Sequence, residues 1–514
     1  MTGYNQTSGG ERISLIKNVR FSWDLIRNSK LISNASVYVM GSMLQKAAAF
    51  LLIPLYTRYI TPSDYGIVGL AQSVQGVISL LIGLGLYSAI ARLYFDFRDK
   101  PNLLRSYIST NFLVVGLFAL ISTLALIQWG KVFWDRLSGG QVAFSPYIQL
   151  ALWLAFADAI FQIPVTLYRT TQRATAFVSA HMAVFLLGVA AIVFFVVIKQ
   201  MGAEGLLIGD LIASLLVSSI LGILLLREYF STHFEWQHVR SSLKFSLPLV
   251  PHAVASWALI AIDRLLLESK GISLDQIGLY NLGYQLGLVM SVLVYGINQA
   301  WSPYYYDLME RVKNPEGRIR QVVLFYVALL GGICLVGILF SYELVHMIAP
   351  SRYQGAEAFI SPILFGHLLL GFYYLASVPL FYFKRTFMIP IITIAGATIN
   401  ILLNLWWIPI WGAMGSAWAT AISYGVTFGI ALIFSFQYQR IELPFIKLSI
   451  IVGLVFAAVI VNTTLNEDQI IREFNLFYYL VKVGLVGVYI FLATIWLARP
   501  AVNMVFHKSR ELIS

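Results

Sequence analysis

YGIVGLAQSVQGVISLLI (residues 65–82) and IGLYNLGYQLGLVMSVLV (residues 277–294) are two apolar stretches that align without a gap. The alignment pairs Gly66 with Gly278, and a short acidic turn precedes each stretch. A stretch of about 20 apolar residues can cross a bilayer as a helix. The pair therefore predicts a membrane protein that is built from a repeated helical unit.

A second match supports the repeat. Residues 202–205 (GAEG) align with residues 412–415 (GAMG) at nearly the same offset. The offset spans six predicted helices, an even number, so the two halves share one orientation and are related by an axis along the membrane normal. Such a repeat is typical of transporters that bind a substrate between two lobes. The alternative is that apolar helices resemble one another through composition alone.

The composition indicates that most of the chain lies in the membrane. Hydrophobic residues make up 59% of the 514 residues and charged residues 11%, with a mean hydropathy of +0.78, whereas soluble proteins carry about 25% charged residues. A large soluble domain is therefore excluded. We expect fourteen spans at approximately 34–57, 66–90, 106–128, 146–168, 176–198, 203–226, 246–267, 277–301, 321–347, 359–383, 386–409, 412–436, 444–464 and 475–498.

These observations predict an all-α polytopic membrane protein with two six-helix lobes and two further C-terminal helices. Helices in such a protein pack against helices rather than around separate soluble cores. The predicted division is a basic N-terminal segment (1–33), an N-lobe (34–226), a linker (227–245), a C-lobe (246–437), the last two spans (438–498) and a tail (499–514).

The distribution of Lys and Arg predicts the orientation. About 25 of the 35 basic residues fall on one side if the N-terminus is cytoplasmic, and positively charged loops resist translocation. We therefore expect both termini in the cytoplasm and the protein in the inner, or plasma, membrane of the cell. The net charge of +11 is then explained by this topology and by anionic membrane lipid, so it does not indicate nucleic-acid binding.

Charged residues inside predicted spans are candidates for a polar path, because each costs about 2.5 to 3.5 kcal/mol at a helix centre. Lys46 lies about twelve residues into the first span, roughly 18 Å along the helix, and is the candidate for binding a phosphate near the midplane. Asp158, equally deep in the fourth span, and Asp210 in the sixth could partner Lys46 or carry a coupling proton. The alternative is a buried Lys46–Asp158 ion pair that fixes helix packing.

The seventh predicted span carries a second charge cluster. His252 lies near its inner end, and Asp263, Arg264 and Glu268 lie near its outer end. These residues are candidates for a coupling and charge network. The alternative is structural, because Arg264 is spaced to pair with Glu268 at i, i+4. Arg58, at the outer end of the first span, is interpreted either as a gate or as an anchor at the interface.

Four arginines lie at the predicted cytoplasmic ends of spans, where they are candidates for binding a phosphate group. Arginine suits this task because its planar guanidinium binds phosphate through two hydrogen bonds. The alternative for each is that it orients the chain under the positive-inside rule. The four residues are Arg92, Arg169, Arg173 and Arg385.

The sequence resembles a known family at three places: PLYTRYITPSDYG (residues 54–66), AIDR (residues 261–264) and IGLY (residues 277–280). These segments are similar to the Wzx-like O-antigen and polysaccharide flippases of the multidrug, oligosaccharidyl-lipid and polysaccharide (MOP) exporter superfamily. The resemblance implies a MATE-like fold. It also implies translocation of an undecaprenyl-pyrophosphate-linked polysaccharide repeat unit from the cytoplasmic to the outer leaflet.

The resemblance implies a transporter rather than an enzyme, with no cofactor, and the chain contains no phosphate-binding loop of the Gly-x-x-x-x-Gly-Lys-Ser/Thr type. With the cell interior negative, outward movement of an anionic headgroup gains about 2.3 kcal/mol per charge per 100 mV. The coupling ion, H⁺ or Na⁺, stays open. The expected partners are the lipid-linked glycan, membrane lipid and polysaccharide polymerase or assembly proteins. The alternatives are a MATE-type multidrug or cation antiporter and a membrane glycan polymerase or ligase.

Overall fold

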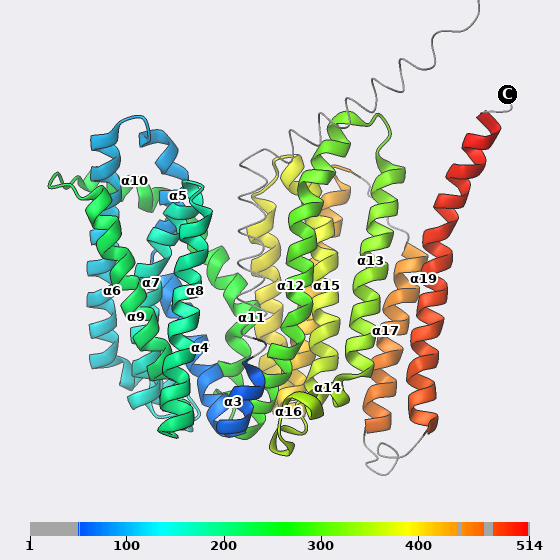
Figure 1. Ribbon diagram of the computed structural model, residues 1–514, viewed down its shortest axis with the longest axis horizontal. Helices are drawn as coiled ribbons and strands as arrows, with labels where there is room; N and C mark the ends of the chain where they lie inside the picture. Colours follow the sequence, from blue (N-terminus) through cyan, green and yellow to red (C-terminus); the bar gives the residue numbers. More distant parts are fainter. Residues whose placement is uncertain (1–49, 51, 440–444, 467–475, 512–514) are drawn as a thin grey trace, which may run out of the picture.

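A computed structural model describes residues 50, 52–439, 445–466 and 476–511 of the chain. Every regular element among these residues is helical, and the helices form two bundles that stand side by side (Figure 1). The predicted N-terminal segment 1–33 lies outside the described residues, as do Lys46 and most of the first predicted span, 34–57. The all-helical fold predicted from the apolar stretches is confirmed.

The N-terminal bundle is centred on α7, which contacts α4, α5, α6, α8 and α9. The short helix α10 follows this bundle and packs on α5 and α6. The elements are α3 (Ile53–Tyr59), α4 (Pro62–Ile82), α5 (Leu86–Phe97), α6 (Pro101–Leu137), a π-helical turn (Phe144–Ile148), α7 (Gln149–Thr170), α8 (Ala174–Ile192), a second π-helical turn (Val193–Ile198), α9 (Gly202–Tyr229) and α10 (Trp236–Ser246).

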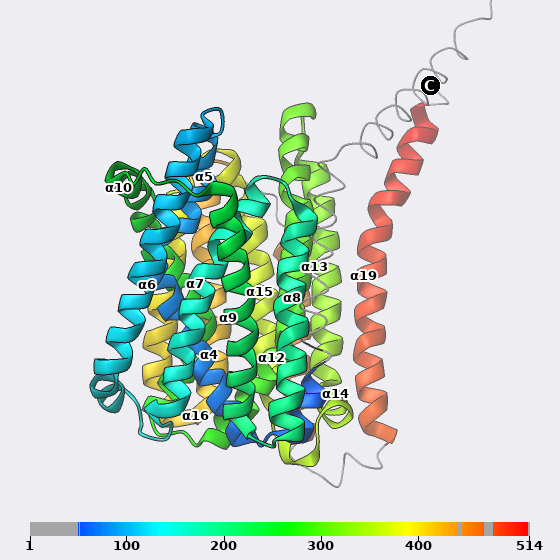
Figure 2. The same ribbon diagram turned by 60° about the vertical axis from the view of Figure 1, so that its left-hand side comes forward.

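The C-terminal bundle is centred on α15, which contacts α12, α13, α14, α16 and α17. Helices α17 and α19 pack on α13 at the flank of this bundle (Figure 1). Figure 2 shows α19 at the same flank. The elements are a 3₁₀ turn (Leu247–Leu249), α11 (Val250–Ser269), α12 (Leu274–Arg311), α13 (Glu316–Leu339), α14 (Ser341–Ile348), a second 3₁₀ turn (Ser351–Tyr353), α15 (Glu357–Tyr382), α16 (Met388–Phe436), α17 (Phe445–Asn466) and α19 (Leu476–Glu511).

Twelve helices among the described residues are long and apolar enough to cross a membrane. One of them, α16, contains both predicted spans 386–409 and 412–436, which meet at a kink at Gly412. Gly412 has φ +58° and ψ −139°, a backbone conformation that glycine adopts without a steric penalty. Since the first predicted span lies mostly outside the described residues, the total of fourteen stays a prediction.

The two bundles meet where α4 packs against α11 and α12. A Cβ atom on Gly66 would lie 2.4 Å from the carbonyl oxygen of Leu274, and one on Gly278 would lie 1.8 Å from that of Pro62. The contact is reciprocal, as expected of an interface on a two-fold axis. The glycines that the sequence alignment paired are therefore the residues at which the two repeats touch.

Candidate functional site

Three charged residues of α11 lie together at the end of the molecule where α4 and α12 begin, which we call the closed end (bottom of Figure 1). The Glu268 side chain is 1% exposed. Its carboxylate accepts hydrogen bonds from the backbone N–H groups of Gly139, at 2.8 Å, and Gln141, at 3.1 Å. The i, i+4 ion pair with Arg264 is therefore not formed. Instead, Glu268 fastens the C-terminal bundle to the segment that follows α6.

The Arg264 guanidinium is buried against tyrosine rings rather than directed to the membrane surface. It is 5% exposed and lies 4.0 Å from the centre of the Tyr284 ring. It donates to the carbonyl oxygen of Ile260 at 2.6 Å and to Asn281 Oδ1 at 3.4 Å. Asn281 Nδ2 in turn donates to the carbonyl oxygen of Tyr65 on α4 at 3.4 Å. Arg264 is thus linked through Asn281 to the other bundle.

Asp263 begins a chain of polar side chains inside the C-terminal bundle. It is fully buried, and its Oδ2 accepts hydrogen bonds from the Tyr280 hydroxyl and, at 3.4 Å, from Thr420 Oγ1. Arg264 Nη1 lies 3.9 Å away. Asp263 Oδ1 has no hydrogen-bond partner among the described residues. One carboxylate oxygen is therefore left for a proton or a small cation.

The chain continues through neutral residues that the sequence analysis did not single out. Asn400 Nδ2 donates to Thr420 Oγ1 at 3.3 Å, Asn404 Nδ2 to Asn400 Oδ1 at 3.2 Å, and Ser416 Oγ to Asn404 Oδ1 at 2.6 Å. All four side chains are buried. Two asparagines spaced i, i+4 within an apolar span could have indicated this chain from the sequence, because buried amides need hydrogen-bond partners.

The N-terminal bundle contains a pocket of about 210 Å³, which we call the N-pocket. Its lining includes Asp158, Gln162 and Arg169 of α7, with Ser79 of α4 and Tyr87 of α5. Asp158 Oδ1 accepts a hydrogen bond from Gln162 Nε2 at 3.1 Å. No carboxylate among the described residues lies within ion-pair distance of Arg169. The pocket thus combines an arginine with a carboxylate that is hydrogen bonded to a neutral amide.

The other three predicted phosphate-binding arginines do not line the N-pocket. Arg173 forms two hydrogen bonds with Glu228, at 2.6 and 2.8 Å, and these raise the pKa of Arg173, which lies in the turn before α8. Arg92 pairs with Asp96 at 3.1 Å on an exposed surface. The Arg385 guanidinium lies 5.1 Å from the centre of the Tyr438 ring. The structure thus brings Arg169, but not the other three, to the N-pocket.

Arg58 contributes to the closed end through its backbone. Its carbonyl oxygen accepts a hydrogen bond from Arg352 Nη2 at 2.7 Å, and the carbonyl oxygen of Thr57 accepts one at 2.8 Å. The Arg58 side chain itself is exposed. Arg352, which sequence reasoning missed, thus links the two bundles at the closed end.

Asp210 faces Gly188 of α8, and it makes no hydrogen bond or ion pair that involves another described residue.

The C-terminal bundle contains a pocket of about 290 Å³ between α11, α12, α15 and α16, which we call the C-pocket. His252 lines it, and His252 Nδ1 lies 2.7 Å from Thr393 Oγ1. His252 is separated from the Asp263 cluster by about three helical turns, so the residues predicted to form one network lie in two places.

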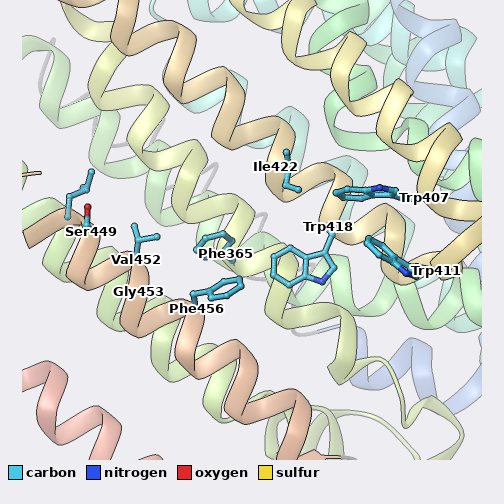
Figure 3. A pocket seen from close by; sticks show the side chains of 10 residues that line it. Phe365, Trp407, Trp411, Trp418, Ile422, Ser449, Val452, Gly453 and Phe456 are labelled. Carbon is cyan, nitrogen blue, oxygen red and sulfur yellow. The ribbon is translucent and has the colours of Figure 1, made fainter. Parts of the chain in front are cut away.

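A third pocket, of about 720 Å³, is almost entirely apolar (Figure 3). It lies between α15, α16 and α17, and Trp407 and Trp411 lie on one side of it with their ring centres 5.0 Å apart. Trp411 is largely exposed at the surface of the bundle. With no charged lining residue, this pocket suits a hydrocarbon chain rather than a headgroup.

Comparison with known proteins finds a family model and related proteins that match this chain. The model of a family described as "Polysaccharide biosynthesis protein" matches residues 31–309 of the chain. An Lsg locus protein of Haemophilus influenzae is 23% identical over 413 residues, which cover 77% of this chain and 98% of that protein. A membrane protein from the same organism is 21% identical over 298 residues, which cover 57% of this chain and 68% of that protein.

Two solved structures show the same fold at low sequence identity. The lipid II flippase MurJ, in an inward closed conformation, aligns with a TM-score of 0.69 and 14% identity over 91% of this chain and all of that chain. An inward-facing multidrug resistance MATE family transporter of the MOP superfamily aligns with a TM-score of 0.60 and 15% identity. That alignment covers 79% of this chain and 95% of that chain. The predicted MATE-like fold is confirmed.

Proposed function

Since the chain belongs to the polysaccharide biosynthesis protein family, we propose that it is a flippase that moves a lipid-linked oligosaccharide across the membrane by alternating access. The proposed substrate is a glycan on undecaprenyl pyrophosphate, and the proposed direction is from the cytoplasmic to the outer leaflet. The observation that carries the proposal is the seam at the closed end, where two repeated bundles meet through a reciprocal glycine contact and through backbone hydrogen bonds. Such contacts can break and re-form as rigid lobes rock.

The distribution of basic residues supports an inward-facing assignment of this conformation. With both termini in the cytoplasm, α4 and α12 begin at the outer surface, so the closed end is the outer end. Glu268, Arg352 and the two glycines then seal the outer side while the inner side receives the substrate. Opening this seam is the proposed step that releases the headgroup outward.

The N-pocket supports a position for the pyrophosphate. In the proposed mechanism Arg169 binds phosphate oxygens through its guanidinium. Arg92, Arg173 and Arg385 do not contact the headgroup and add only a weak long-range attraction from the cytoplasmic side. Lys46, which lies outside the described residues, stays the proposed midplane contact. The polyprenyl chain remains in hydrocarbon beside the protein, where the apolar pocket between α15, α16 and α17 is available to it.

Asp263 is the proposed centre of ion coupling. Its free Oδ1 and the oxygen-rich chain through Thr420 and Asn400 can take up a proton or a small cation. Because Asp263 adjoins Arg264, uptake at this carboxylate changes the electrostatic balance of the seam. Asp158, Asp210 and His252 remain secondary proposals for the same role.

The experiment that tests the function measures transport of a fluorescent undecaprenyl-pyrophosphate oligosaccharide in proteoliposomes. We expect the wild-type protein to move the lipid between leaflets and Asp263→Asn to move it slowly, with a rate that no longer depends on the ion gradient. Export of an organic cation without movement of the lipid would favour the multidrug alternative. Glycan polymerisation in the same vesicles would favour the enzymatic alternative.

A further inference from the structure

We propose that the C-pocket is a binding subsite for an uncharged sugar residue of the glycan. The inference rests on the proposed function and deepens it, because it divides the headgroup between the two lobes. Phosphate binds on the side of the N-pocket, and the sugar binds in the C-pocket.

The two pockets share two equivalent walls: α4 and α7 line the N-pocket, and their counterparts α12 and α15 line the C-pocket. The remaining walls differ, being α5 and α6 in the N-pocket and α11 and α16 in the C-pocket. The offset that relates Gly66 to Gly278 also relates the last residue of α7, Thr170, to the last residue of α15, Tyr382. Both helices are the central helices of their bundles. A residue that lines the N-pocket from α7 can therefore be compared directly with its counterpart on α15.

The comparison shows that the charges have been replaced by apolar and aromatic groups. Asp158, Gln162 and Arg169 of the N-pocket correspond to Leu370, Tyr374 and Phe381. All three of these counterparts line the C-pocket. No Asp, Glu, Lys or Arg is among the residues that line it. On the wall that α7 and α15 share, the formal charges of the N-pocket are thus absent from the C-pocket, which makes the C-pocket a poor site for pyrophosphate.

The lining that replaces the charges is suited to a sugar ring. Tyrosine rings offer flat apolar faces and a polar edge, and serine and threonine hydroxyls can both donate and accept hydrogen bonds, as sugar hydroxyls require. The Tyr295 and Tyr374 rings contact each other edge to face, with centres 5.3 Å apart. The aromatic and polar groups of the lining include Tyr295, Tyr373, Tyr424, Ser256, Ser377 and Thr427.

One polar atom of the lining is left without a partner. Asn298 Oδ1 is buried and accepts no hydrogen bond from the described residues. Buried polar side-chain atoms are nearly always hydrogen bonded in folded proteins, so a hydroxyl donor is expected at this position. A sugar hydroxyl supplies a donor without bringing a charge into the pocket.

The size and the opening of the C-pocket limit what enters it. Its volume of about 290 Å³ corresponds to roughly ten waters at about 30 Å³ each, which accommodates a sugar residue but not a whole oligosaccharide. The side chains of Tyr295 and Phe381 are 36% and 44% exposed, so the pocket is open on their side. The rest of the glycan can extend out through this opening.

Cysteine protection tests the assignment. In a background of Cys334→Ser, which removes the single native cysteine, Ser256→Cys places a thiol in the C-pocket and Ser79→Cys places one in the N-pocket as the matched control. Both serines are half-buried, and each hydroxyl donates within its own helix, to His252 and Gly76 respectively. Maleimide labelling is measured with undecaprenyl-pyrophosphate oligosaccharide and with bare undecaprenyl pyrophosphate.

We expect the glycan-bearing lipid to slow labelling of Ser256→Cys by about tenfold at a concentration about ten times its Kd, while bare undecaprenyl pyrophosphate slows only Ser79→Cys. Equal protection of Ser256→Cys by both lipids, or protection of Ser79→Cys alone by both, would overturn the inference. If neither lipid protects either thiol and the wild-type protein moves neither lipid, the proposed function itself fails.

Two further measurements keep the test decisive. If Ser256→Cys does not react in the absence of lipid, Ser302→Cys on α12 reports on the same pocket. Asn298→Leu removes the unpartnered acceptor, and we expect it to raise the KM for the glycan-bearing lipid by about tenfold relative to the KM for the bare lipid, the loss that corresponds to about 1.4 kcal/mol. An equal change in both KM values would contradict a sugar contact at Asn298.

Discussion

The two lobes touch each other symmetrically but are charged differently. Gly66 and Gly278 occupy equivalent positions and approach each other's helices in the same way. The offset between them relates Glu268, which holds two backbone amides, to Tyr56, which is uncharged. In the seam, the buried charge therefore lies on the C-terminal lobe.

In the pockets the distribution is reversed. The N-pocket carries Asp158 and Arg169, whereas the C-pocket has Leu370 and Phe381 at the corresponding positions. The difference teaches that the repeat determines where helices lie, while a few substitutions on α7 and α15 decide what each lobe can bind. The arrangement of the helices and the binding properties of the pockets can therefore be changed by separate substitutions.

Disrupting the reciprocal contact of Gly66 and Gly278 should have the largest effect on transport. Gly278→Ala places a Cβ 1.8 Å from the carbonyl oxygen of Pro62, so α4 and α12 must separate. At about 3 kcal/mol, the upper end for overpacking, the closed end would lose roughly a hundredfold in population, and transport in proteoliposomes should fall by a similar factor. Gly429→Ala, with open space around the added Cβ, is the matched control. Wild-type transport by Gly278→Ala would refute the contact's role.

Removing the Glu268 carboxylate, which has no charged counterpart in the N-terminal lobe, should have the next largest effect on the stability of the closed end. Glu268→Ala leaves the amides of Gly139 and Gln141 without their acceptor, at a cost of about 1 to 3 kcal/mol. We expect a membrane-impermeant maleimide to label the buried Thr57→Cys position about tenfold faster in this background than in wild type. Glu268→Gln should fall between the two, because it retains an acceptor oxygen. Unchanged labelling would mean that the hydrogen bonds of Glu268 do not keep the two bundles together at the closed end.

Removing the positive charge of the N-pocket sharpens the comparison between the pockets. Arg169→Ala should raise the KM for the lipid-linked substrate by about tenfold, the loss of a charge-assisted hydrogen bond of about 1.5 kcal/mol. Arg173→Ala is the control, since that guanidinium is already held by Glu228. Titration of labelled lipid against transport rate gives both values. A larger effect of Arg173→Ala would move the phosphate site out of the N-pocket.

The smallest effect is expected at Arg92. Its pair with Asp96 is exposed on both sides, and such surface pairs contribute about 0.2 to 1 kcal/mol. Arg92→Ala should therefore change the KM by less than about fivefold and leave the melting temperature nearly unchanged. A larger, salt-dependent loss of substrate binding, measured at low ionic strength, would instead mean that Arg92 contacts the headgroup directly.

Much of the fold could be predicted from the sequence, because length and apolar composition alone identify membrane helices. The alignment of Gly66 with Gly278 predicted the repeat, but it did not predict that the two lobes touch at these glycines, where small residues permit a close helix contact. The break predicted between the spans 386–409 and 412–436 falls at the kink at Gly412, where the backbone leaves the helical conformation. Periodicity does not distinguish a kink from a short loop.

The partners of the site residues could not be predicted. Glu268 binds backbone amides of a segment about 130 residues away, and backbone groups leave no signature in a sequence. Lys482, which donates to Glu343 at 2.7 Å, lies inside the predicted span 475–498 and could have been identified as a candidate by its charge alone. Asn400 and Asn404 were missed because a neutral amide in a membrane span is a weaker signal of a polar path than a charged residue, which is costly to bury.

The reciprocal glycine contact also bears on how the two lobes could diverge. If the two repeats were separate identical chains, one substitution at this glycine would place a side chain on both sides of the axis and introduce two clashes at once. In a single chain, residues 66 and 278 are encoded independently, so each lobe can change without forcing the same change on its counterpart. Fusion of the repeats therefore permits an asymmetric protein, in which the pocket of one lobe carries charges and the pocket of the other carries neutral polar groups.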